Sequence, residues 1–564
     1  MEQNVLEQIA FRSGAEFYTP LPKGYKVGKT KYVVVTGSVI SGIGKGIFTS
    51  SLAKLLADRN IKVSPIKLEA YFNVDAGTLN PYRHGEVFVL DDGTETDMDL
   101  GTYERLLEKN LAAENFLTSG KIYQRIIEKE RRGEYLGRDV QFIPHVTGEI
   151  KKALRELAVK SKADVVLIEI GGTVGDYENL FALEAIRELR YEEGQGNVCI
   201  VNMTYILKPK NLGEHKSKAA QLGIRKLLEI GIQPDIIVCR SEEPVPNKII
   251  EKVSLNANVP MKNVVGMPDI NNIYAIPLFL RRLGVDGAVL KVLGLEGKFG
   301  MKNGNAKLKR WTEQNIVRKP RKTITIGIAG KYTGLHDAYI SILKALEHCE
   351  AKLKIKINLK WIETTEIENN KLHAKDALKD VSGLIVPGGF GARGAEGKIA
   401  CINYCRKRNI PFLGLCFGFQ LAVVEFARNV CRLRDADSTE FNAKTKHPVI
   451  CILPEQLDAK NLGATMRLGG QDVLIKQGSA AYKLYKSKMI RERFRHRYNI
   501  NPEYIGILEK QGMLFSGSAK NAKIMQILEL PEHKFFIATQ FHPEFTSRPL
   551  NPNPLFYGFV KACL

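Results

Sequence analysis

The chain has 564 residues, of which 44% are hydrophobic and 26% are charged, and it contains 49 glycines and 23 prolines. This composition is typical of globular proteins and excludes a disordered, collagen-like or coiled-coil chain, and at about 150 residues per domain we expect two to four domains. The formal net charge of +22 favours phosphorylated small molecules as ligands, because the sequence has no zinc-finger spacing, no aromatic ribonucleoprotein motif and no long basic run.

Targeting signals and cysteine usage indicate the compartment. No apolar run reaches the length of a membrane span, and the first 30 residues lack the apolar core of a secretory signal. Nine cysteines are an odd number for a disulfide framework, so we expect reduced thiols. These features predict a cytoplasmic protein that binds neither a membrane nor nucleic acid.

The N-terminal half of the chain begins its periodic pattern at Lys31. A β-rich run at residues 31–37 precedes a glycine-rich turn, an amphipathic helical pattern at 47–59 and a second strand pattern at 61–68. This order of elements predicts a parallel sheet with helices on its faces. Further apolar runs alternate with helical patterns along this half, at residues 163–170, 197–207 and 234–240.

The pattern changes between Gly297 and Lys322, where polar and basic residues predict a surface linker. A second α/β pattern follows, with strand-like runs at 323–330, 382–391, 410–416 and 535–544. The chain is therefore predicted to belong to the α/β class, with two parallel-sheet domains of which the first is P-loop-like. The predicted divisions are an N-terminal extension of unknown role at 1–30, a first domain at 31–296, a basic linker at 297–322 and a second domain at 323–564.

The turn after the first strand has the composition of a phosphate-binding loop. Residues 36–46, TGSVISGIGKG, carry glycines that let backbone N–H groups turn toward an anion at a helix N-terminus. Lys45 would reach the β- and γ-phosphates of a nucleotide. The match to G-x-x-x-x-G-K-[ST] is imperfect, because Val39 replaces the first glycine and Gly46 follows the lysine. An ordinary glycine turn is the alternative interpretation.

Three carboxylates are candidates for a metal site beside this loop. Asp97 and Asp99 lie in GTETDMDLG, and Glu169 stands near the end of a strand-like run. A carboxylate at the C-terminal end of a parallel strand faces the ligand crevice, and Mg²⁺ is commonly held by one or two carboxylates plus nucleotide phosphates. The sequence predicts Mg²⁺ as cofactor and no redox cofactor, although each acid alone is more often a solvated loop charge.

A cysteine in the C-terminal half has the surroundings of a nucleophile. Cys416 lies in GLCFGFQ between a strand-like run and a helical pattern, at a helix N-terminus where a thiolate is favoured. His542 is a candidate base with Glu544 to orient it, and residues 387–391 offer N–H groups to an oxyanion. Alone, such a cysteine is more often a buried thiol and such a His-Pro-Glu a turn. Together, G-x-C-x-G-x-Q and H-P-E resemble the triad-type glutamine amidotransferase domain.

Long blocks of the N-terminal half resemble the synthase domain of the CTP synthases, from about Lys31 to Val292. The blocks are TGSVISGIGKG, KLEAYFNVDAGT, HGEVFVLDDGTETDMDLGTYER, IEIGGTVGDYE and IGIQPDIIVCRS. The resemblance implies a ligase that uses ATP to aminate UTP at C4, through 4-phosphorylated UTP, with ammonia from glutamine channelled between two domains. It also implies a role in pyrimidine biosynthesis, CTP as feedback inhibitor, GTP as activator and a homotetramer.

The resemblance assigns roles in the synthase domain residue by residue. Lys67 matches the lysine near the transferred phosphoryl group, and Asp99 and Glu169 match the Mg²⁺ ligands. The ATP-binding positions are Gly42, Ile43, Gly44, Lys45, Gly46, Ile47, Asp99, Arg240, Asp269 and Ile270. The UTP- and CTP-binding positions are Ser41, Asp176, Tyr177, Glu178, Lys216, Ser217, Lys218, Ala219, Ala220, Gln221 and Lys252. His84 and Val87 match the exit of the ammonia tunnel.

In the second domain the resemblance makes Cys416 the nucleophile that forms a γ-glutamyl thioester, His542 its base and Glu544 the acid that orients the base. The glutamine-binding positions are Gly389, Phe417, Gly418, Phe419, Gln420, Glu440 and Arg497. Residues 464–470, ATMRLGG, resemble the lid on which GTP acts.

The sequence departs from the family pattern in two groups of positions. Where the family has Pro, Pro, Pro and Thr, this chain has Ala70, Ala76, Ala219 and Ala220. Looser loops at these positions would change UTP affinity and CTP feedback. Phe417 and Phe419 replace a leucine and a methionine, which enlarges two side chains and would change the KM for glutamine without changing the chemistry.

Two other functions stay open at this stage. One is a different amidotransferase with a similar loop, such as a cobyrinate-type amide synthase, but Lys216, Lys218 and Lys252 suit a triphosphate. The other is a filament-forming or scaffold protein without activity, and the two intact catalytic constellations argue against it.

Overall fold

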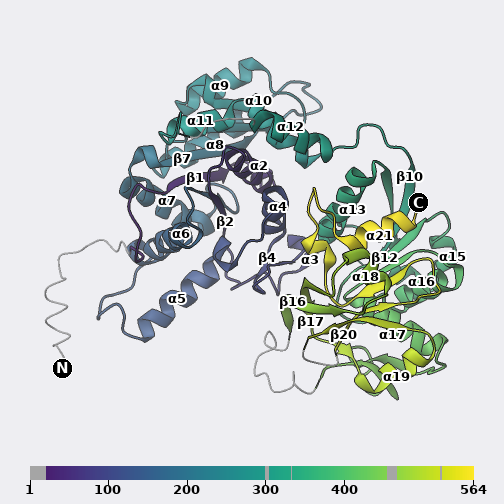
Figure 1. The fold of residues 1–564 in the computed structure, drawn as a ribbon. Helices are drawn as coiled ribbons and strands as arrows, with labels where there is room; N and C mark the ends of the chain where they lie inside the picture. The colour runs from purple at the N-terminus through teal and green to yellow at the C-terminus, as the bar shows by residue number, and fades with distance from the viewer. Residues whose placement is uncertain (1–20, 299–303, 332, 454–465, 521–523) are drawn as a thin grey trace. The chain divides into compact units, whose positions relative to one another are not determined.

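The computed structural model describes residues 21–298, 304–331, 333–453, 466–520 and 524–564. The chain divides into two compact units, one of Met1–Thr78 and Thr102–Glu313 and the other of Leu79–Gly101 and Gln314–Leu564 (Figure 1). Most of the predicted N-terminal extension, part of the predicted linker and the first two residues of ATMRLGG lie outside the described residues. Within the described ranges no helix is both long and apolar enough to cross a lipid bilayer.

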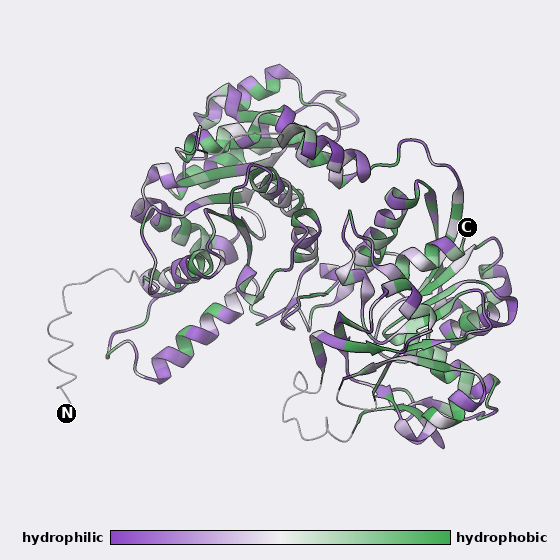
Figure 2. Cartoon of the chain, viewed as in Figure 1, coloured by the Kyte–Doolittle hydropathy of each residue, from purple (hydrophilic) through white to green (hydrophobic). Residues whose placement is uncertain are grey.

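Unit 1 is built on a seven-stranded sheet in the order β5-β2-β6-β1-β7-β8-β9, and every pairing in it is parallel. In that order the strands are Phe116–Thr118, Val63–Glu69, Val165–Ile170, Lys31–Gly37, Val198–Tyr205, Ile236–Ser241 and Val264–Pro268. The strands are hydrophobic along most of their length (Figure 2) because both faces of the sheet are covered. The predicted parallel sheet is confirmed.

Alternate residues of the strands belong to two cores. Val33 and Val35 of β1 pack in a cluster with Phe48 of α2, whereas Tyr32 and Val34 pack in the cluster of α6 and α7 on the opposite face. The helices of the first face are α2 (Lys45–Ala57), α10 (Ile276–Arg282), α11 (Val285–Val292) and α12 (Gly304–Gln314). Further helices of unit 1 are α5 (Ser119–Arg131), α6 (Thr147–Ser161), α7 (Leu180–Glu193), α8 (Lys218–Glu229) and α9 (Asn247–Ala257).

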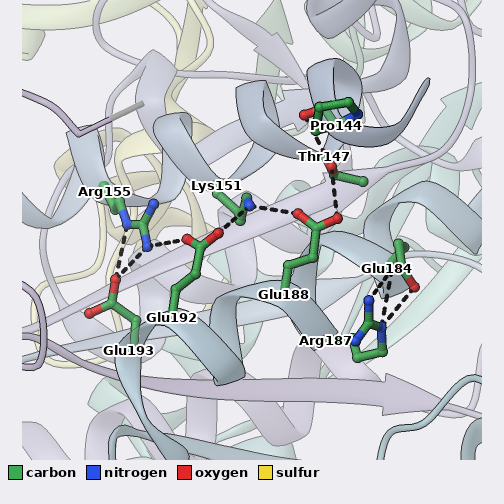
Figure 3. A network of polar contacts seen from close by, with 9 residues as sticks. All are labelled: Pro144, Thr147, Lys151, Arg155, Glu184, Arg187, Glu188, Glu192 and Glu193. Atoms are coloured by element: carbon green, nitrogen blue, oxygen red, sulfur yellow. Dashed lines mark hydrogen bonds and ion pairs between the residues drawn. The ribbon is translucent and has the colours of Figure 1, made fainter. Parts of the chain in front are cut away.

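A ladder of buried charges joins α6 to α7 (Figure 3). Lys151 Nζ lies 2.5 Å from carboxylate oxygens of both Glu188 and Glu192, and Arg155 Nη2 lies 2.8 Å from Glu193 Oε1. The Arg155 and Glu193 side chains are fully buried. Removing one partner of such a pair leaves an uncompensated buried charge, so the ladder fixes how α7 is aligned on α6.

Helix α12 lies inside the segment predicted to be a surface linker. Its Leu308 and Trp311 are buried in the same core cluster as α2. The two residues are three apart and face one side of the helix, while their neighbours are mostly basic. Part of this basic segment therefore folds onto unit 1, which the sequence analysis did not predict.

Unit 2 contains a nine-stranded mixed sheet in the order β11-β10-β12-β13-β21-β20-β19-β16-β17. The first five strands, which pair in parallel, are Lys356–Glu363, Thr323–Gly330, Gly383–Val386, Phe412–Leu415 and Phe536–Thr539. The other four, which pair antiparallel, are Met525–Glu529, Leu514–Ala519, Arg467–Ile475 and Met489–His496. The parallel half is as predicted, and the antiparallel half is an addition to it.

Helices and a small second sheet complete unit 2. The helices are α13 (Ile340–Leu353), α14 (Thr364–Glu368), α15 (Ala374–Ala377), α16 (Ala395–Arg408), α17 (Phe417–Asn429), α18 (Ala480–Tyr485), α19 (Pro502–Lys510), α20 (Pro543–Thr546) and α21 (Pro554–Ala562). The small sheet consists of β14 (Ala436–Ser438), β15 (His447–Cys451) and β18 (Asn499–Ile500).

Residues 79–101 pack with unit 2, although in sequence they interrupt unit 1. They form α3 (Pro81–His84), β3 (Phe88–Val89), β4 (Glu95–Thr96) and the start of α4 (Met98–Leu107). Asp91 pairs with Arg491 of β17 at 3.0 Å, and Glu95 pairs with Arg495 of the same strand at 2.6 Å. The sequence analysis counted these residues in the first domain, and the boundaries of the functional domains stay a prediction.

Candidate functional sites

The glycine-rich loop follows β1 and leads into α2. Gly44, directly before the helix, has φ 90° and Gly42 has φ 69°, which glycine adopts without steric cost. Val39, the departure from the motif, also has a positive φ, of 80°. Lys45 is buried, and its Nζ donates to the carbonyl oxygen of Gly172 at 2.6 Å. The loop thus turns sharply through left-handed residues into the N-terminus of α2, where the sequence predicts that a phosphate binds.

Arg240 joins this loop to the end of a second strand. Its guanidinium donates to the carbonyl oxygen of Ile43 at 3.3 Å and to Asp269 Oδ1 at 2.6 Å. Arg240 lies near the end of β8, and Asp269 directly follows β9. The structure therefore brings together the loop, Arg240 and Asp269, which the sequence predicted to bind ATP, at the carboxyl edge of the parallel sheet.

Lys67 and Glu169 lie opposite each other on neighbouring strands β2 and β6. Lys67 Nζ is 3.0 Å from Glu169 Oε1 and 3.2 Å from Glu69 Oε1, and the Tyr103 hydroxyl donates to Glu169. Lys67 and Glu169 are both buried. A lysine held between two carboxylates is fixed in position at the sheet edge. The sequence analysis gave Glu69 no role, and its contact with Lys67 places it in this cluster.

Asp97 directly precedes α4 and Asp99 lies in its first turn, in the segment grouped with unit 2. Asp97 Oδ1 accepts the backbone N–H of Asp99 at 3.0 Å, which fixes this turn. Within the described ranges no group of three or more His, Cys, Asp or Glu side chains is arranged to hold a metal ion.

The residues expected to bind the pyrimidine triphosphate include three exposed lysines, Lys216, Lys218 and Lys252. Lys218 begins α8, and Lys252 lies on α9. Gln221 Nε2 donates to Ser217 Oγ at 3.1 Å, one turn earlier in the chain. The side chain of Ala220, in contrast, is fully buried in the core between α8 and the sheet. Its methyl group therefore faces the protein interior.

The segment expected to contact cytidine lies after β6. Asp176 Oδ2 accepts the N–H of Thr173 at 2.9 Å, and Tyr177 is largely exposed. Glu178 lines a small cavity of about 20 Å³ together with Ala70, one of the positions that depart from the family pattern. The replaced proline site is therefore part of this cavity wall.

Cys416 occupies a sharp turn between β13 and α17 in unit 2. Its φ of 49° and ψ of −92° are rare for a residue with a side chain. A Cβ atom on Gly418 would lie 2.2 Å from the carbonyl oxygen of Val386, and one on Gly414 would lie 2.8 Å from Cβ of Ala538. Both glycines of G-x-C-x-G are thus needed for close packing. The turn presents the thiol at the helix N-terminus as the motif predicts.

His542 and Glu544 stand at the end of β21, where α20 begins. His542 Nδ1 lies 2.7 Å from Glu544 Oε1, so Glu544 orients the ring. Burial opposes a charge on the ring, but the negative charges of Glu544 and Cys416 act more strongly together and raise the pKa of His542 to about 10. A Cβ on Gly388 would lie 2.9 Å from His542 Cε1 and 3.7 Å from Cys416 Cβ, so the three residues adjoin.

A cavity of about 110 Å³ opens onto this triad. Its lining includes Cys416, His542, Gly388, Gly389 and Val87. The residues predicted to form the oxyanion turn therefore lie beside Cys416. Of the two positions predicted for an ammonia tunnel, Val87 reaches this cavity, whereas His84 is exposed on α3.

The predicted glutamine-binding residues surround the same turn. Glu440 Oε1 accepts the N–H of Gly391 at 2.6 Å. Burial raises the pKa of Glu440, and Arg497 is one of the groups that act in the opposite direction. Gln420 Nε2 donates to the carbonyl oxygen of Tyr498 at 3.0 Å.

The two phenylalanines that depart from the family pattern are both buried. Phe417 packs edge-on against Phe441 with ring centroids 5.5 Å apart, and Phe419 is fully buried in the same core cluster. The two enlarged side chains are thus accommodated in the core behind the triad.

The sequence analysis missed two residues of β17 that hold the triad. The carbonyl oxygen of Arg493 accepts the N–H of His542 at 2.8 Å, and that of Arg495 lies 3.5 Å from Cys416 Sγ. Their side chains hold residues 79–101, since Arg493 donates to the carbonyl oxygen of Val89 at 3.0 Å and Arg495 pairs with Glu95. No motif marks them, because the contacts arise from tertiary packing.

Known protein families match both halves of the chain. A family model described as CTP synthase N-terminus matches residues 31–295, and one described as glutamine amidotransferase class-I matches residues 335–562. The CTP synthase of Pyrococcus abyssi is 50% identical over 535 residues, which cover 94% of this chain and 98% of that protein. The chain belongs to the CTP synthase family. A CTP synthase of Thermus thermophilus is 46% identical over 95% of this chain and 97% of its own length.

A solved structure described as the glutaminase domain of Trypanosoma brucei CTPS with bound acivicin is 37% identical and covers 43% of this chain and 93% of that one, with a TM-score of 0.40. Family membership confirms the resemblance found in the sequence, and the two matched models confirm a synthase part followed by an amidotransferase part.

Proposed function

We propose that this chain makes CTP from UTP, ATP and glutamine. The observation that carries the proposal is the grouping of Cys416, His542 and Glu544 around one cavity. The same cavity is lined by Val87, which lies in the part of the sequence that matches the CTP synthase N-terminus. A chain with both a nucleotide loop and an amide-hydrolysing triad can release ammonia and use it. Relatives named CTP synthase match this chain over nearly its whole length.

Glutamine hydrolysis starts with the thiolate of Cys416. The sulfur attacks the side-chain carbonyl carbon, and N–H groups of the Gly388–Gly389 turn stabilise the developing negative charge on oxygen. The imidazolium of His542 gives its proton to the leaving nitrogen, so the C–N bond breaks and ammonia departs from a γ-glutamyl thioester. Water activated by His542 then hydrolyses the thioester to glutamate, while Glu544 holds the ring in orientation.

Amination proceeds in two steps on UTP. O4 of UTP attacks the γ-phosphorus of ATP, ADP leaves, and the oxygen becomes part of a phosphate leaving group. Ammonia then forms a bond to C4 and inorganic phosphate departs, which gives CTP. In this proposal Lys45 and Lys67 would balance charge on the phosphoryl group, and Arg240 and Asp269 would contact the adenine side of ATP.

Each of the two residues expected to bind Mg²⁺ has the donor chemistry that suits this ion. Asp99 and Glu169 offer hard carboxylate oxygens, and Lys67 and Tyr103 fix the orientation of Glu169. Because the described residues supply few metal ligands, nucleotide phosphates would complete the coordination. A bound Mg²⁺ would neutralise phosphate charge during transfer.

Ammonia would pass through the cavity beside Cys416 toward Val87, with His84 at the exit. Free ammonia is mostly protonated at neutral pH and then not nucleophilic, so an enclosed path keeps it reactive. Inhibition by CTP, activation by GTP, a homotetramer and a cytoplasmic location stay predictions that rest on the resemblance.

The direct test is CTP formation measured by absorbance with UTP, ATP and Mg²⁺, using either glutamine or ammonium chloride as nitrogen source. We expect both to support CTP formation. A panel of carboxylic-acid acceptors, including cobyrinate, tests the alternative amidotransferase. Glutamine hydrolysis without CTP formation from either source would refute the proposal.

A further inference from the structure

Lys398 of α16 is a buried amine close to the triad. The side chain has no solvent exposure, and among the residues that the structure describes its Nζ finds no hydrogen-bond partner. The amine lies 4.7 Å from the centroid of the Phe417 ring, and a Cβ on Gly389 would lie 3.8 Å from it. The amine therefore lies beside Gly389, which belongs to the predicted oxyanion turn, and beside Phe417, which directly follows Cys416.

A buried amine without a hydrogen-bond partner is costly. Burial of an unpaired ionised group destabilises the folded state, and nearly all buried polar groups in proteins have partners. A hydrophobic side chain of similar size would pack against Phe417 without this cost. The position is thus poor for stability, which points to a role in the chemistry next to it.

Burial and neighbouring charges change the pKa of the Lys398 amine. Burial and the charge of Lys331 lower the pKa of Lys398 to about 7, while negative charge on Glu363 and Cys416 acts in the opposite direction. Electrostatic coupling is reciprocal, so the ammonium form of Lys398 also favours negative charge that develops beside Cys416. The substrate oxygen acquires such a charge when the thiolate attacks.

We propose that Lys398 is a positioning residue for glutamine hydrolysis, whose ammonium group acts through the Gly388–Gly389 turn and Phe417 to favour the oxyanion formed at Cys416. The inference rests on the proposed glutaminase activity. The amine does not line the substrate cavity, so it acts by its field through the wall of the site rather than by contact. In a dry interior such a field is weakly screened.

The first test replaces Lys398 by methionine, a neutral side chain of similar length. We expect the kcat for glutamine hydrolysis to fall at least tenfold, with the KM for glutamine within threefold of the parent. CTP formation from ammonium chloride should stay within twofold, and the midpoint of thermal unfolding should be equal or higher. Lys407→Met is the matched control, because Lys407 is an exposed lysine on the same helix.

A purely structural role predicts the reverse, namely a lower unfolding midpoint with similar losses in both activities, and that result would overturn the proposal. An unchanged kcat in Lys398→Met would overturn it as well. Failure of the proposed function itself is distinguishable, because the parent enzyme would then hydrolyse no glutamine.

A second readout is the pH profile, which packing alone would not change. The ratio of parent to Lys398→Met kcat should be largest near pH 6 and fall as pH rises, since the amine loses its proton above its pKa of about 7. The groups that face the amine are Lys331 after β10, Glu363 at the end of β11 and Cys416 before α17, and all are retained in the variant. A ratio that is constant across pH 6–10 would contradict the proposal.

Discussion

Gly418→Ala tests how tightly the nucleophile turn is packed. The new Cβ would lie 2.2 Å from the carbonyl oxygen of Val386, a backbone atom of β12, which pairs with a strand on each side in the sheet. To reach 3.0 Å, the shortest separation that real Cβ atoms show, α17 must move by roughly 0.8 Å at its first turn. Cys416 precedes that turn and moves with it. Because a misplacement of about 1 Å costs about 100-fold in rate, we expect glutamine-dependent kcat to fall by about that factor.

The assay compares CTP formation from glutamine with that from ammonium chloride. The ammonia-dependent rate should stay within about twofold, because the change lies at the thiol and not at the nucleotide loop. Gly506→Ala is the control, since Gly506 lies in α19 of the same unit and a Cβ there would meet no atom within 4 Å. A glutamine-dependent rate of Gly418→Ala within threefold of the parent would refute the geometric reasoning.

Three other substitutions probe separate parts of the protein. Cys416→Ala should abolish glutamine-dependent CTP formation and leave the ammonia-dependent rate intact, because only thioester formation needs the sulfur; loss of both rates in a folded variant would contradict two separate sites. Lys45→Ala should abolish CTP formation from either nitrogen source while basal glutamine hydrolysis persists, and near-normal CTP output would exclude the phosphate-loop assignment. Glu95→Gln should lower the free energy of unfolding by about 3 kcal/mol, because it breaks a largely buried pair with Arg495, and slow glutamine hydrolysis several-fold; chemical denaturation and a glutaminase assay check both effects.

The parts of the fold that could be predicted are those whose residues carry their own signal. Strands β1 and β6 are short apolar runs because a parallel sheet buries them on both faces. The turn at Cys416 was readable because only glycine fits at Gly414 and Gly418. In both cases the physical constraint acts within a few residues of chain.

Other features depend on contacts between distant residues, which no local pattern reveals. Among the residues of α12 whose burial is described, the deeply buried apolar ones are Leu308 and Trp311, a stripe too narrow to stand out in a basic segment. Lys398 reads as an ordinary helix lysine until its burial is known. Arg495 and Glu95 are 400 residues apart, so their pairing follows only from the packing of the 79–101 segment on β17.

Strand β17 contacts both the 79–101 segment and the residues around Cys416. Arg493 and Arg495 are two residues apart on the strand, so their side chains point to the same face of the sheet. Both side chains contact residues 88–95, Arg493 through the carbonyl oxygen of Val89 and Arg495 through Glu95. Their backbone carbonyl oxygens contact the N–H of His542 and Sγ of Cys416. Residues 88–95 are followed closely in the sequence by α4, which contains Asp99. The strand whose backbone contacts His542 and Cys416 is therefore the same strand whose side chains hold residues 88–95, so a change in the packing of that segment acts on β17 directly.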